Sequence, residues 1–125
     1  MPLARTILLV EDDTDLRRLF RMVLSFAGFH VLEAGTAIHA LHLADAEPLD
    51  LVVLDLGLPA VSGHVVYEEL RIHPATRHVP ILVVTARPAP HPGIDETVVL
   101  QKPVSPEQLL DSVQVRLRMA AQRSA

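Results

Sequence analysis

Short, continuous apolar runs recur along the chain and are separated by segments with helical periodicity. Runs without alternation are typical of strands that are covered on both faces, as in a parallel sheet. The predicted strands are Thr6–Val10, His30–Leu32, Leu51–Leu54, Ile81–Val84 and Thr97–Leu100. Of these, His30–Leu32 has the weakest strand pattern.

Four amphipathic segments predict the helices that connect or follow these strands. Within Asp15–Ala27 the apolar side chains repeat at helical spacing, and Arg17, Arg18 and Arg21 fall on the solvent face. The second helix begins after Thr36 with Ala37, Ile38, Leu41 and Ala44 facing inward, the third spans Ser62–Ile72, and the last begins after Ser105 and frays after about Met119. The order of elements predicts an α/β fold with right-handed crossovers between parallel strands.

The connection between the fourth and fifth predicted strands does not fit this pattern. The segment Arg87–Glu96 contains Pro88, Pro90 and Pro92, which remove backbone donors that a helix would use. It also has only the minimum length for a crossover that includes a helix. We therefore predict an extended loop here, with at most one helical turn near Gly93–Glu96.

Composition narrows the class of protein. A chain of 125 residues corresponds to one domain, residues 1–125, with a folded core of about residues 5–119. The absence of cysteine excludes disulfides and thiolate metal sites, and a net charge of −4 without a basic block argues against nucleic-acid binding through this domain. No apolar run approaches the length of a membrane span, so we expect no membrane contact and a cytoplasmic location.

Polar residues follow the predicted strands at their carboxyl ends, which is where ligands bind in open α/β sheets. Glu11 and Asp12 follow the first strand, Asp55 the third, Thr85 the fourth and Lys102 the fifth. Clustered carboxylates repel each other unless a cation lies among them, and hard oxygen ligands favour Mg²⁺. A carboxylate nucleophile, a metal, a lysine and a hydroxyl together suit phosphoryl transfer to an aspartate.

Four segments carry a more specific resemblance. TILLVEDD, LVVLDLGLPAVSG, PILVVTA and QKPVSPEQL are similar to motifs of the receiver domain of bacterial two-component response regulators. The resemblance extends from Arg5 to about Met119. It implies a flavodoxin-like three-layer sandwich with five parallel strands in the order 2-1-3-4-5. It also implies a phosphoryl acceptor that catalyses its own phosphorylation and dephosphorylation, with a histidine kinase or histidine phosphotransfer protein as partner.

The resemblance assigns the metal site and the phosphoacceptor by position. Asp55 matches the phosphoacceptor, and Glu11 and Asp12 match the acidic pair, with Asp12 as a direct Mg²⁺ ligand. Gly57 matches the residue whose backbone carbonyl also holds the metal. We expect Asp13 to cap the following helix rather than to bind the metal.

The remaining assignments concern the phosphoryl group itself. Thr85 and Lys102 match the hydroxyl and the lysine that contact the phosphate, and Ala86 matches a neighbouring cofactor-binding position. The Lys102–Pro103 peptide bond matches one that is usually cis in the family. Leu16 and Pro103 flank the acidic residues and are candidate contacts for the partner.

The chain departs from the family in its fourth-helix region. Val99 stands where the family usually has an aromatic residue, and the Arg87–Glu96 loop replaces the usual fourth helix. We therefore do not expect the usual dimer through the fourth helix, fifth strand and fifth helix. These departures also motivate an alternative, a receiver-fold interaction module whose phosphorylation-dependent switching is weakened or lost.

Two further classes of function are disfavoured. A hydrolase with an aspartyl nucleophile, such as a haloacid dehalogenase-like phosphatase, needs an acid two residues after the nucleophile, where this chain has Gly57. Zinc binding by His39 and His42 lacks a third ligand nearby in the sequence, and His91, like the other scattered histidines, is expected at the surface.

Overall fold

Five parallel strands form the central layer of the molecule, whose residues 3–124 are described by the computed structural model. The strands are β1 (Thr6–Val10), β2 (His30–Ala34), β3 (Leu51–Leu54), β4 (Ile81–Thr85) and β5 (Val99–Gln101). They pair in the order β2-β1-β3-β4-β5, as the resemblance implied. Because β1 and β3 are neighbours although they are not consecutive, their carboxyl ends open onto one shared site.

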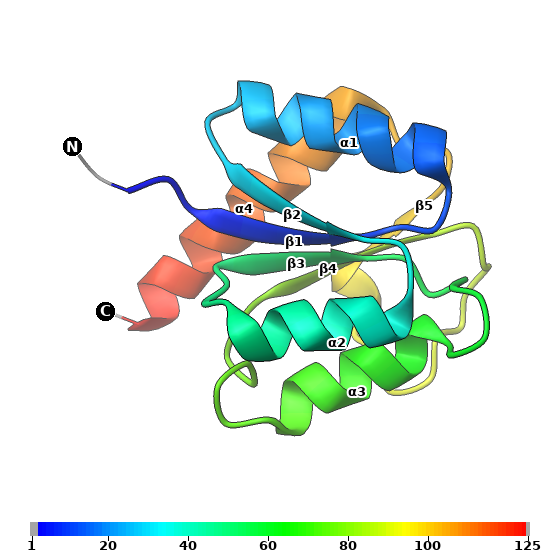
Figure 1. Cartoon of the computed structure of the whole chain (residues 1–125). Coiled ribbons are helices and arrows are strands. Elements are labelled where there is room, and N and C mark those ends of the chain that lie inside the picture. The colour runs from blue at the N-terminus through cyan, green and yellow to red at the C-terminus, as the bar shows by residue number, and fades with distance from the viewer. Residues whose placement is uncertain (1–2, 125) are drawn as a thin grey trace.

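Two layers of helices cover the sheet. The helices are α1 (Thr14–Phe26), α2 (Ala37–Ala46), α3 (Gly63–Ile72) and α4 (Pro106–Ser124). Figure 1 shows α1 and α4 on one face of the sheet and α2 and α3 on the other. Ile7 and Leu9 pack towards α1 and α4, whereas Leu8 and Val10 pack into the core on the opposite face. A strand buried on both sides needs apolar residues at consecutive positions, which explains the continuous runs in the sequence.

The helix starts agree with the predicted caps. The side chains of Asp13, Thr36, Ser62 and Ser105 each accept a backbone N–H from the first turn of the helix that follows. The expected inward position of Ile38 is wrong, because this side chain is 60% exposed. Small side chains at Ala37, Ala40 and Ala44 form the buried stripe of α2 instead.

The C-terminal helix is longer than expected. It continues through Ser124 rather than fraying after Met119. Leu109, Val113 and Leu117 are buried against the sheet and fix the first three turns. The helix then continues beyond the core contacts. None of the helices within residues 3–124 is long and apolar enough to span a membrane.

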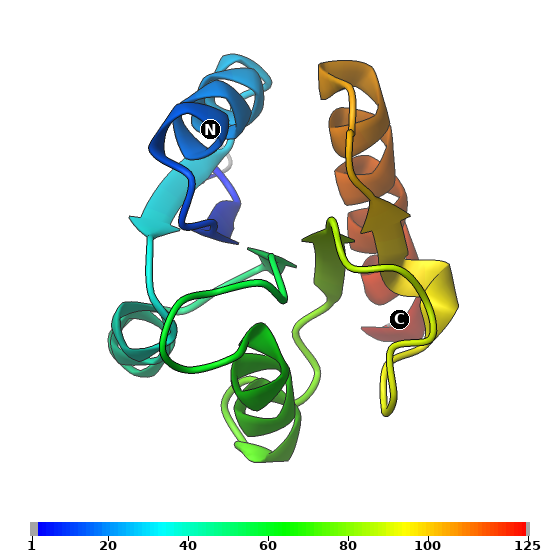
Figure 2. The same cartoon turned by 90° about the vertical axis from the view of Figure 1, so that its right-hand side faces the viewer.

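The fourth-helix region is a loop, as predicted. The chain between β4 and β5 contains one short 3₁₀ turn, η1 (Glu96–Val98), slightly later than the predicted turn. The Asp95 carboxylate accepts the N–H of Thr97 and starts this turn, so β5 begins at Val99 and not at Thr97. Figure 2 shows the loop beside β5, on the side of the sheet where α3 lies. Ile94 is buried in the core on that face and supplies an apolar contact where no helix is present.

Candidate functional site: an acidic pocket at the carboxyl ends of the strands

Backbone hydrogen bonds fix the two acidic segments relative to each other. The N–H of Glu11 donates to the carbonyl of Ala34 at 3.0 Å, and the N–H of Asp55 donates to the carbonyl of Val10, also at 3.0 Å. Both residues therefore continue the pairing of the sheet one position beyond the strands. Their side chains start from rigid backbone rather than from mobile loops.

Three carboxylates converge at this edge of the sheet. One oxygen each of Glu11, Asp12 and Asp55 lies within 4.8 Å of the others, and these are the residues that the sequence predicted. Glu11 is 2% exposed and Asp55 is 5% exposed, whereas Asp12 faces solvent. The pocket therefore combines two buried acids with one acid at its opening.

Lys102 reaches into the cluster from the end of β5. Its Nζ lies 2.6 Å from Oε1 of Glu11 and 3.0 Å from Oδ2 of Asp55. One ammonium thus neutralises part of the charge of two buried carboxylates, which would otherwise repel each other. These two carboxylates hold the pKa of Lys102 above its usual value despite the opposing effect of burial. The Lys102–Pro103 peptide bond is cis, as the resemblance implied.

The protonation of Glu11 responds to this environment. Burial raises the pKa of Glu11 from 4.5 to about 7, and the charge of Asp55 acts in the same direction. The hydrogen bonds from Lys102 and from the N–H of Asp13 lower the pKa and so oppose the rise. Asp13 itself caps α1 and does not belong to the acidic cluster, in agreement with the sequence prediction.

The donor set fits Mg²⁺. Three carboxylates from two adjacent strand ends can share one small hard cation while its remaining positions keep water. Asp55 is held in place because its Oδ1 accepts the N–H of Gly57 at 2.9 Å. The other oxygen of Asp55 faces Lys102, so each oxygen of this carboxylate has a defined partner.

Thr85 and Ala86 lie at the end of β4. Thr85 is completely buried, and its carbonyl accepts the N–H of Lys102 at 2.8 Å. This bond joins the predicted hydroxyl and the predicted lysine through their backbones. Ala86 is exposed, and its carbonyl accepts a hydrogen bond from the Gln101 side chain at 2.8 Å. The structure gives Ala86 a role in joining β4 to β5, and its assignment as a cofactor-binding residue stays a prediction.

Gly63 supports the acceptor loop and was not singled out in the sequence. A Cβ atom at this position would overlap the carbonyl oxygen of Asp55 and lie 2.6 Å from Cα of Leu56. The first turn of α3 therefore packs directly against the backbone that carries Asp55. The available signal was a glycine at the second position of the predicted helix Ser62–Ile72, because glycine is unfavourable inside a helix.

Arg17 was expected on a solvated helix face, but the structure ties it to the pocket. Its Nη1 donates to the carbonyl of Glu11 at 2.8 Å, and its Nε lies 3.5 Å from Glu33. Arg21 reaches the same glutamate at 3.4 Å. The basic face of α1 thus braces β2 and the turn that carries Glu11.

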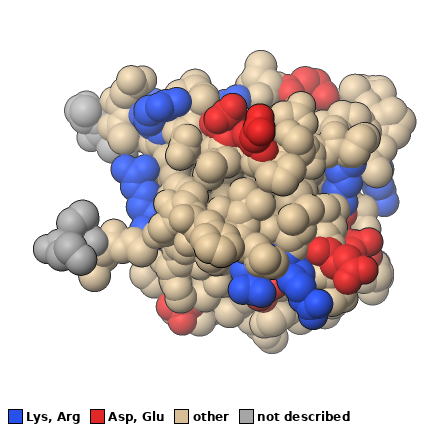
Figure 3. Space-filling model, turned by 90° about the horizontal axis from the view of Figure 1, so that it is seen from above, with Lys and Arg blue, Asp and Glu red and all other residues tan. Residues whose placement is uncertain are grey.

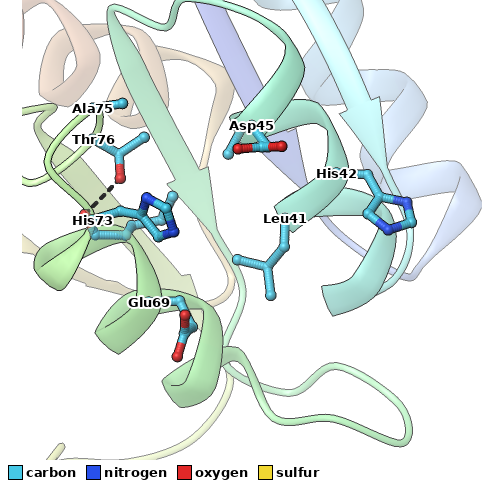
Figure 4. A pocket seen from close by; sticks show the side chains of 9 residues that line it. Leu41, His42, Asp45, Glu69, His73, Ala75 and Thr76 are labelled. Carbon is cyan, nitrogen blue, oxygen red and sulfur yellow. Dashed lines mark hydrogen bonds between the residues drawn. The ribbon is translucent and has the colours of Figure 1, made fainter.

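Within residues 3–124, no histidine belongs to a group of three or more potential metal ligands. Figure 4 shows His42 pointing away from His73, across a cavity of about 310 Å³ between α2 and α3. Glu11, Asp12 and Asp55 are the one potential metal-binding group among residues 3–124. The expected surface position of His91 is wrong, however, because this residue is 4% exposed. Residues of the same loop, including Arg87 and Glu96, cover the His91 side chain, and this burial could not be predicted from the sequence pattern.

Comparison with known proteins identifies the family. The sequence matches the model of the response regulator receiver domain over residues 7–114, so the chain belongs to this family. It is 37% identical to the uncharacterized transcriptional regulatory protein YrkP of Bacillus subtilis over 124 residues, which cover 93% of this chain and 51% of YrkP. The chain thus spans about half the length of that relative. Over 84 residues it is 32% identical to the polar-differentiation response regulator DivK of Brucella ovis, covering 67% of this chain and 68% of DivK.

Solved structures share the fold. The chemotaxis response regulator CheY4 of Vibrio cholerae superposes with a TM-score of 0.81 at 26% identity, covering 90% of this chain and 98% of CheY4. The receiver domain of sensor histidine kinase PA1611 of Pseudomonas aeruginosa has a TM-score of 0.79 at 24% identity, with coverage of 92% and 98%, and contains a coordinated magnesium ion in its active site cleft. The chain is therefore a two-component signalling domain rather than a classical enzyme.

Proposed function

We propose that this receiver domain, residues 1–125, accepts a phosphoryl group on Asp55 from a phosphohistidine partner, with Mg²⁺ held in the acidic pocket. The observation that carries the proposal is the convergence of three carboxylates with one lysine at the end of β1 and β3. Asp12, Glu11, Asp55 and the carbonyl of Gly57 are the proposed metal ligands. The magnesium ion in the cleft of the PA1611 receiver supports the choice of metal.

The chemistry of transfer follows from the positions of these groups. An oxygen of Asp55 attacks the phosphorus atom, and the phosphorus–nitrogen bond of the phosphohistidine breaks. The electron pair of that bond stays on the departing imidazole nitrogen, which takes a proton from solvent water. A bound divalent cation neutralises the oxygens of the transferred group. Lys102 lies 3.0 Å from Asp55 and places a positive charge beside those oxygens. Water can later attack the same phosphorus atom and return Asp55 to its carboxylate, which is the proposed self-catalysed dephosphorylation.

Intact-protein mass spectrometry tests the proposal directly. Incubation with a small phosphodonor and Mg²⁺ should add one phosphoryl group to the wild type and none to Asp55→Asn. Asp45→Asn is a matched control, since Asp45 is an exposed aspartate on α2 far from the acidic cluster in the sheet. Labelling of Asp55→Asn at the wild-type level would show that another residue is the acceptor.

The alternative is an interaction module without phosphorylation-dependent switching. Val99 and the helix-free loop favour it, because the usual coupling between a hydroxyl and an aromatic ring is absent. The same experiment separates the two functions. A folded wild-type protein that stays unlabelled with saturating donor and Mg²⁺ would favour the interaction module.

The proposed partner is a histidine kinase or a histidine phosphotransfer protein in the cytoplasm. Figure 3 shows the face over α1 and α4, where charged side chains are sparse and form small separate groups. Leu16 is half-buried on α1 and follows the acidic segment after β1, whereas Pro103 is exposed and directly follows Lys102. Leu16→Glu should slow transfer from a phosphohistidine protein and leave labelling by a small donor unchanged. Equal loss of both reactions would mean damage to the pocket itself.

Charge and the altered loop argue against two other partners. The net charge of −4, without a basic block in the sequence, disfavours nucleic-acid binding through this domain. The usual dimer face is also altered, because the loop and Val99 replace a helix and an aromatic residue beside β5. We therefore propose that phosphorylation does not produce that dimer, which sedimentation with and without a phosphodonor can test.

A further inference from the structure

His91 is a buried polar side chain within the exposed, proline-rich Arg87–Glu96 loop. Its Nδ1 lies 2.9 and 3.0 Å from the two carboxylate oxygens of Glu96, and its Nε2 lies 2.9 Å from the carbonyl oxygen of Arg87. A carboxylate and a carbonyl only accept hydrogen bonds, so both ring nitrogens must carry a proton to satisfy these contacts. The hydrogen bond to Glu96 raises the pKa of His91, in agreement with this imidazolium form.

The imidazolium closes the loop on itself. The backbone N–H of His91 also donates to Glu96 at 2.9 Å, so one carboxylate holds both the side chain and the backbone of His91. The N–H of Ile94 donates to the carbonyl of His91 at 3.0 Å, and the Ile94 side chain is anchored in the core. The loop is therefore a closed, hydrogen-bonded unit that is attached to the protein interior.

Arg87 connects this unit to the pocket. Its carbonyl accepts the hydrogen bond from His91, and its N–H donates to Oγ1 of Thr85 at 3.1 Å. The backbone of Thr85 is held separately by Lys102, through the 2.8 Å bond to the Thr85 carbonyl. The hydrogen bond from Arg87 therefore holds the orientation of the Thr85 hydroxyl, and it does not determine the position of the Thr85 backbone.

The hydroxyl of Thr85 is left with a proton to donate. A threonine hydroxyl has one donor and two acceptor positions, and the N–H of Arg87 occupies one acceptor position. Among residues 3–124 this hydroxyl has no hydrogen bond besides the one it accepts from Arg87, although Thr85 is completely buried. A buried donor without an acceptor is costly, so a ligand oxygen that reached it would gain a hydrogen bond.

We propose that His91 is a positioning residue for the Thr85 hydroxyl, which it orients through Arg87, and that the loop moves with this hydroxyl when an acceptor occupies the pocket. The inference rests on the proposed function, because the acceptor is the phosphoryl group on Asp55. Coupling between two sites is reciprocal. A change at His91 should therefore alter binding in the pocket, and binding in the pocket should alter the loop.

Two substitutions at His91 separate positioning from mere stabilisation of the loop. In His91→Gln the side-chain amide can still donate to Arg87 from a position near Nε2, whereas His91→Asn can replace only the donor near Nδ1 that faces Glu96. The probe is beryllofluoride with Mg²⁺, a mimic of an aspartyl phosphate, titrated and followed by fluorine NMR. His91→Asn should weaken binding about fivefold or more, and His91→Gln should stay within about twofold of the wild type.

Hydrogen exchange supplies the second readout. In the wild type, beryllofluoride should change the exchange of the amides of residues 87–98, and this change should be lost in His91→Asn and kept in His91→Gln. Should both variants unfold, Glu96→Gln provides the test, because it removes the charge that holds His91 and leaves the imidazole in place. It should weaken the exchange response, whereas an unaltered response would overturn the proposal.

The controls distinguish failure of the proposed phosphorylation of Asp55 from failure of the proposed role of His91. If the wild type does not bind beryllofluoride more tightly than Asp55→Asn, the proposed function fails. If the wild type binds and both His91 variants match its affinity and its exchange response, the proposed function stands and the role of His91 is refuted. Equal weakening in both variants would also refute it, because it would show a general effect of loop damage.

Discussion

The acidic pocket and the Arg87–Glu96 loop are built on opposite principles. In the pocket, Glu11 and Asp55 extend directly from adjacent strands, and their backbones continue the hydrogen bonding of the sheet. In the loop, prolines prevent regular structure, and a single ion pair between His91 and Glu96 closes the segment. The pocket thus inherits its geometry from the fold, whereas the loop depends on a few side-chain contacts. The backbone of the pocket should therefore keep its geometry when contacts within the loop are lost.

Gly63→Ala should have the largest effect on stability, because it breaks the packing beneath the pocket. The new Cβ would overlap the Asp55 carbonyl, and backbone atoms cannot move aside as a flexible side chain can. We expect a loss of about 3 kcal/mol in the free energy of unfolding, measured by urea denaturation. Gly57→Ala is the matched control, since its Cβ would lie 3.6 Å from Oδ1 of Asp55 in ordinary contact. Similar losses in both variants would contradict this account of Gly63.

The ion pair of the loop should show a defined pH dependence. The pKa of His91 is raised above 6.5, so its stabilising contribution is complete below pH 6.5 and is lost as the pH rises through the raised value. The hydrogen bonds from His91 lower the pKa of Glu96 below 4.5 despite the opposing effects of desolvation and of Asp95, so the contribution of Glu96 is lost as the pH falls through the lowered value. The contribution of the pair should therefore be largest between about pH 4.5 and 6.5.

Two variants measure this contribution. His91→Ala should cost about 2 kcal/mol near pH 6, because two hydrogen bonds of the buried ring are lost. The difference in Tm between wild type and Glu96→Gln should be widest in the same window and should narrow on both sides of it. A difference that does not change from pH 4 to 9 would show that the pair does not titrate as described.

Metal binding should stabilise the pocket and leave the loop interactions unchanged. A ligand that binds only the folded state stabilises it by RT ln(1 + [L]/Kd), which is roughly 1.4 kcal/mol at ten times Kd. Mg²⁺ should therefore raise the Tm of the wild type by several degrees, and Asp12→Ala should abolish the rise. His91→Ala is the control from the other region and should keep it. Concentrations of about tens of millimolar Mg²⁺ should occupy even a weak site. If the Tm of the wild type does not change at such concentrations, the proposed metal site is excluded.

Relief of backbone strain at Ala60, in the loop after β3, should give the smallest effect. Ala60 has φ +63°, in the left-handed region that disfavours residues with a Cβ atom. Ala60→Gly should raise stability by up to about 1 kcal/mol, partly offset by the greater freedom of glycine in the unfolded chain.

Gly93 has φ +80° with open space around it, so Gly93→Ala should lower stability by about 1–2 kcal/mol. Thermal unfolding of the two variants should thus give shifts of opposite sign.

The sequence predicted the parts of the fold that depend on local pattern. The runs at Thr6–Val10 and Leu51–Leu54 coincide with β1 and β3, because strands buried on both faces need continuous apolar residues. The side chains that cap helices were also found from local pattern, because a capping side chain bonds to a backbone N–H only two or three residues away. The start of β5 was missed because Asp95 draws Thr97 into a 3₁₀ turn. Thr85 and Lys102 were found because they follow predicted strands at their carboxyl ends, and the resemblance to a known family added their expected contact with the phosphate.

The residues that the sequence did not reveal act across the fold. Arg17 is six residues from Glu11, and its contact depends on how α1 leaves β1. Gly63 matters because α3 approaches the backbone after β3, which no local pattern encodes. His91 lies among prolines and has no periodic neighbours, so its burial depends on the closure of the whole loop. Long-range packing decided each of these positions.

The single lysine in the pocket has a consequence for the order of events. Three carboxylates against one ammonium formally leave two negative charges at the mouth of the sheet, the amount that one divalent cation balances. A phosphodonor is itself an anion and is repelled from such a pocket until that charge is compensated. The cation should therefore bind first and the donor second. The initial rate of labelling should then depend on Mg²⁺ at low donor concentration, and rising donor concentration should shift this dependence to lower Mg²⁺ concentrations.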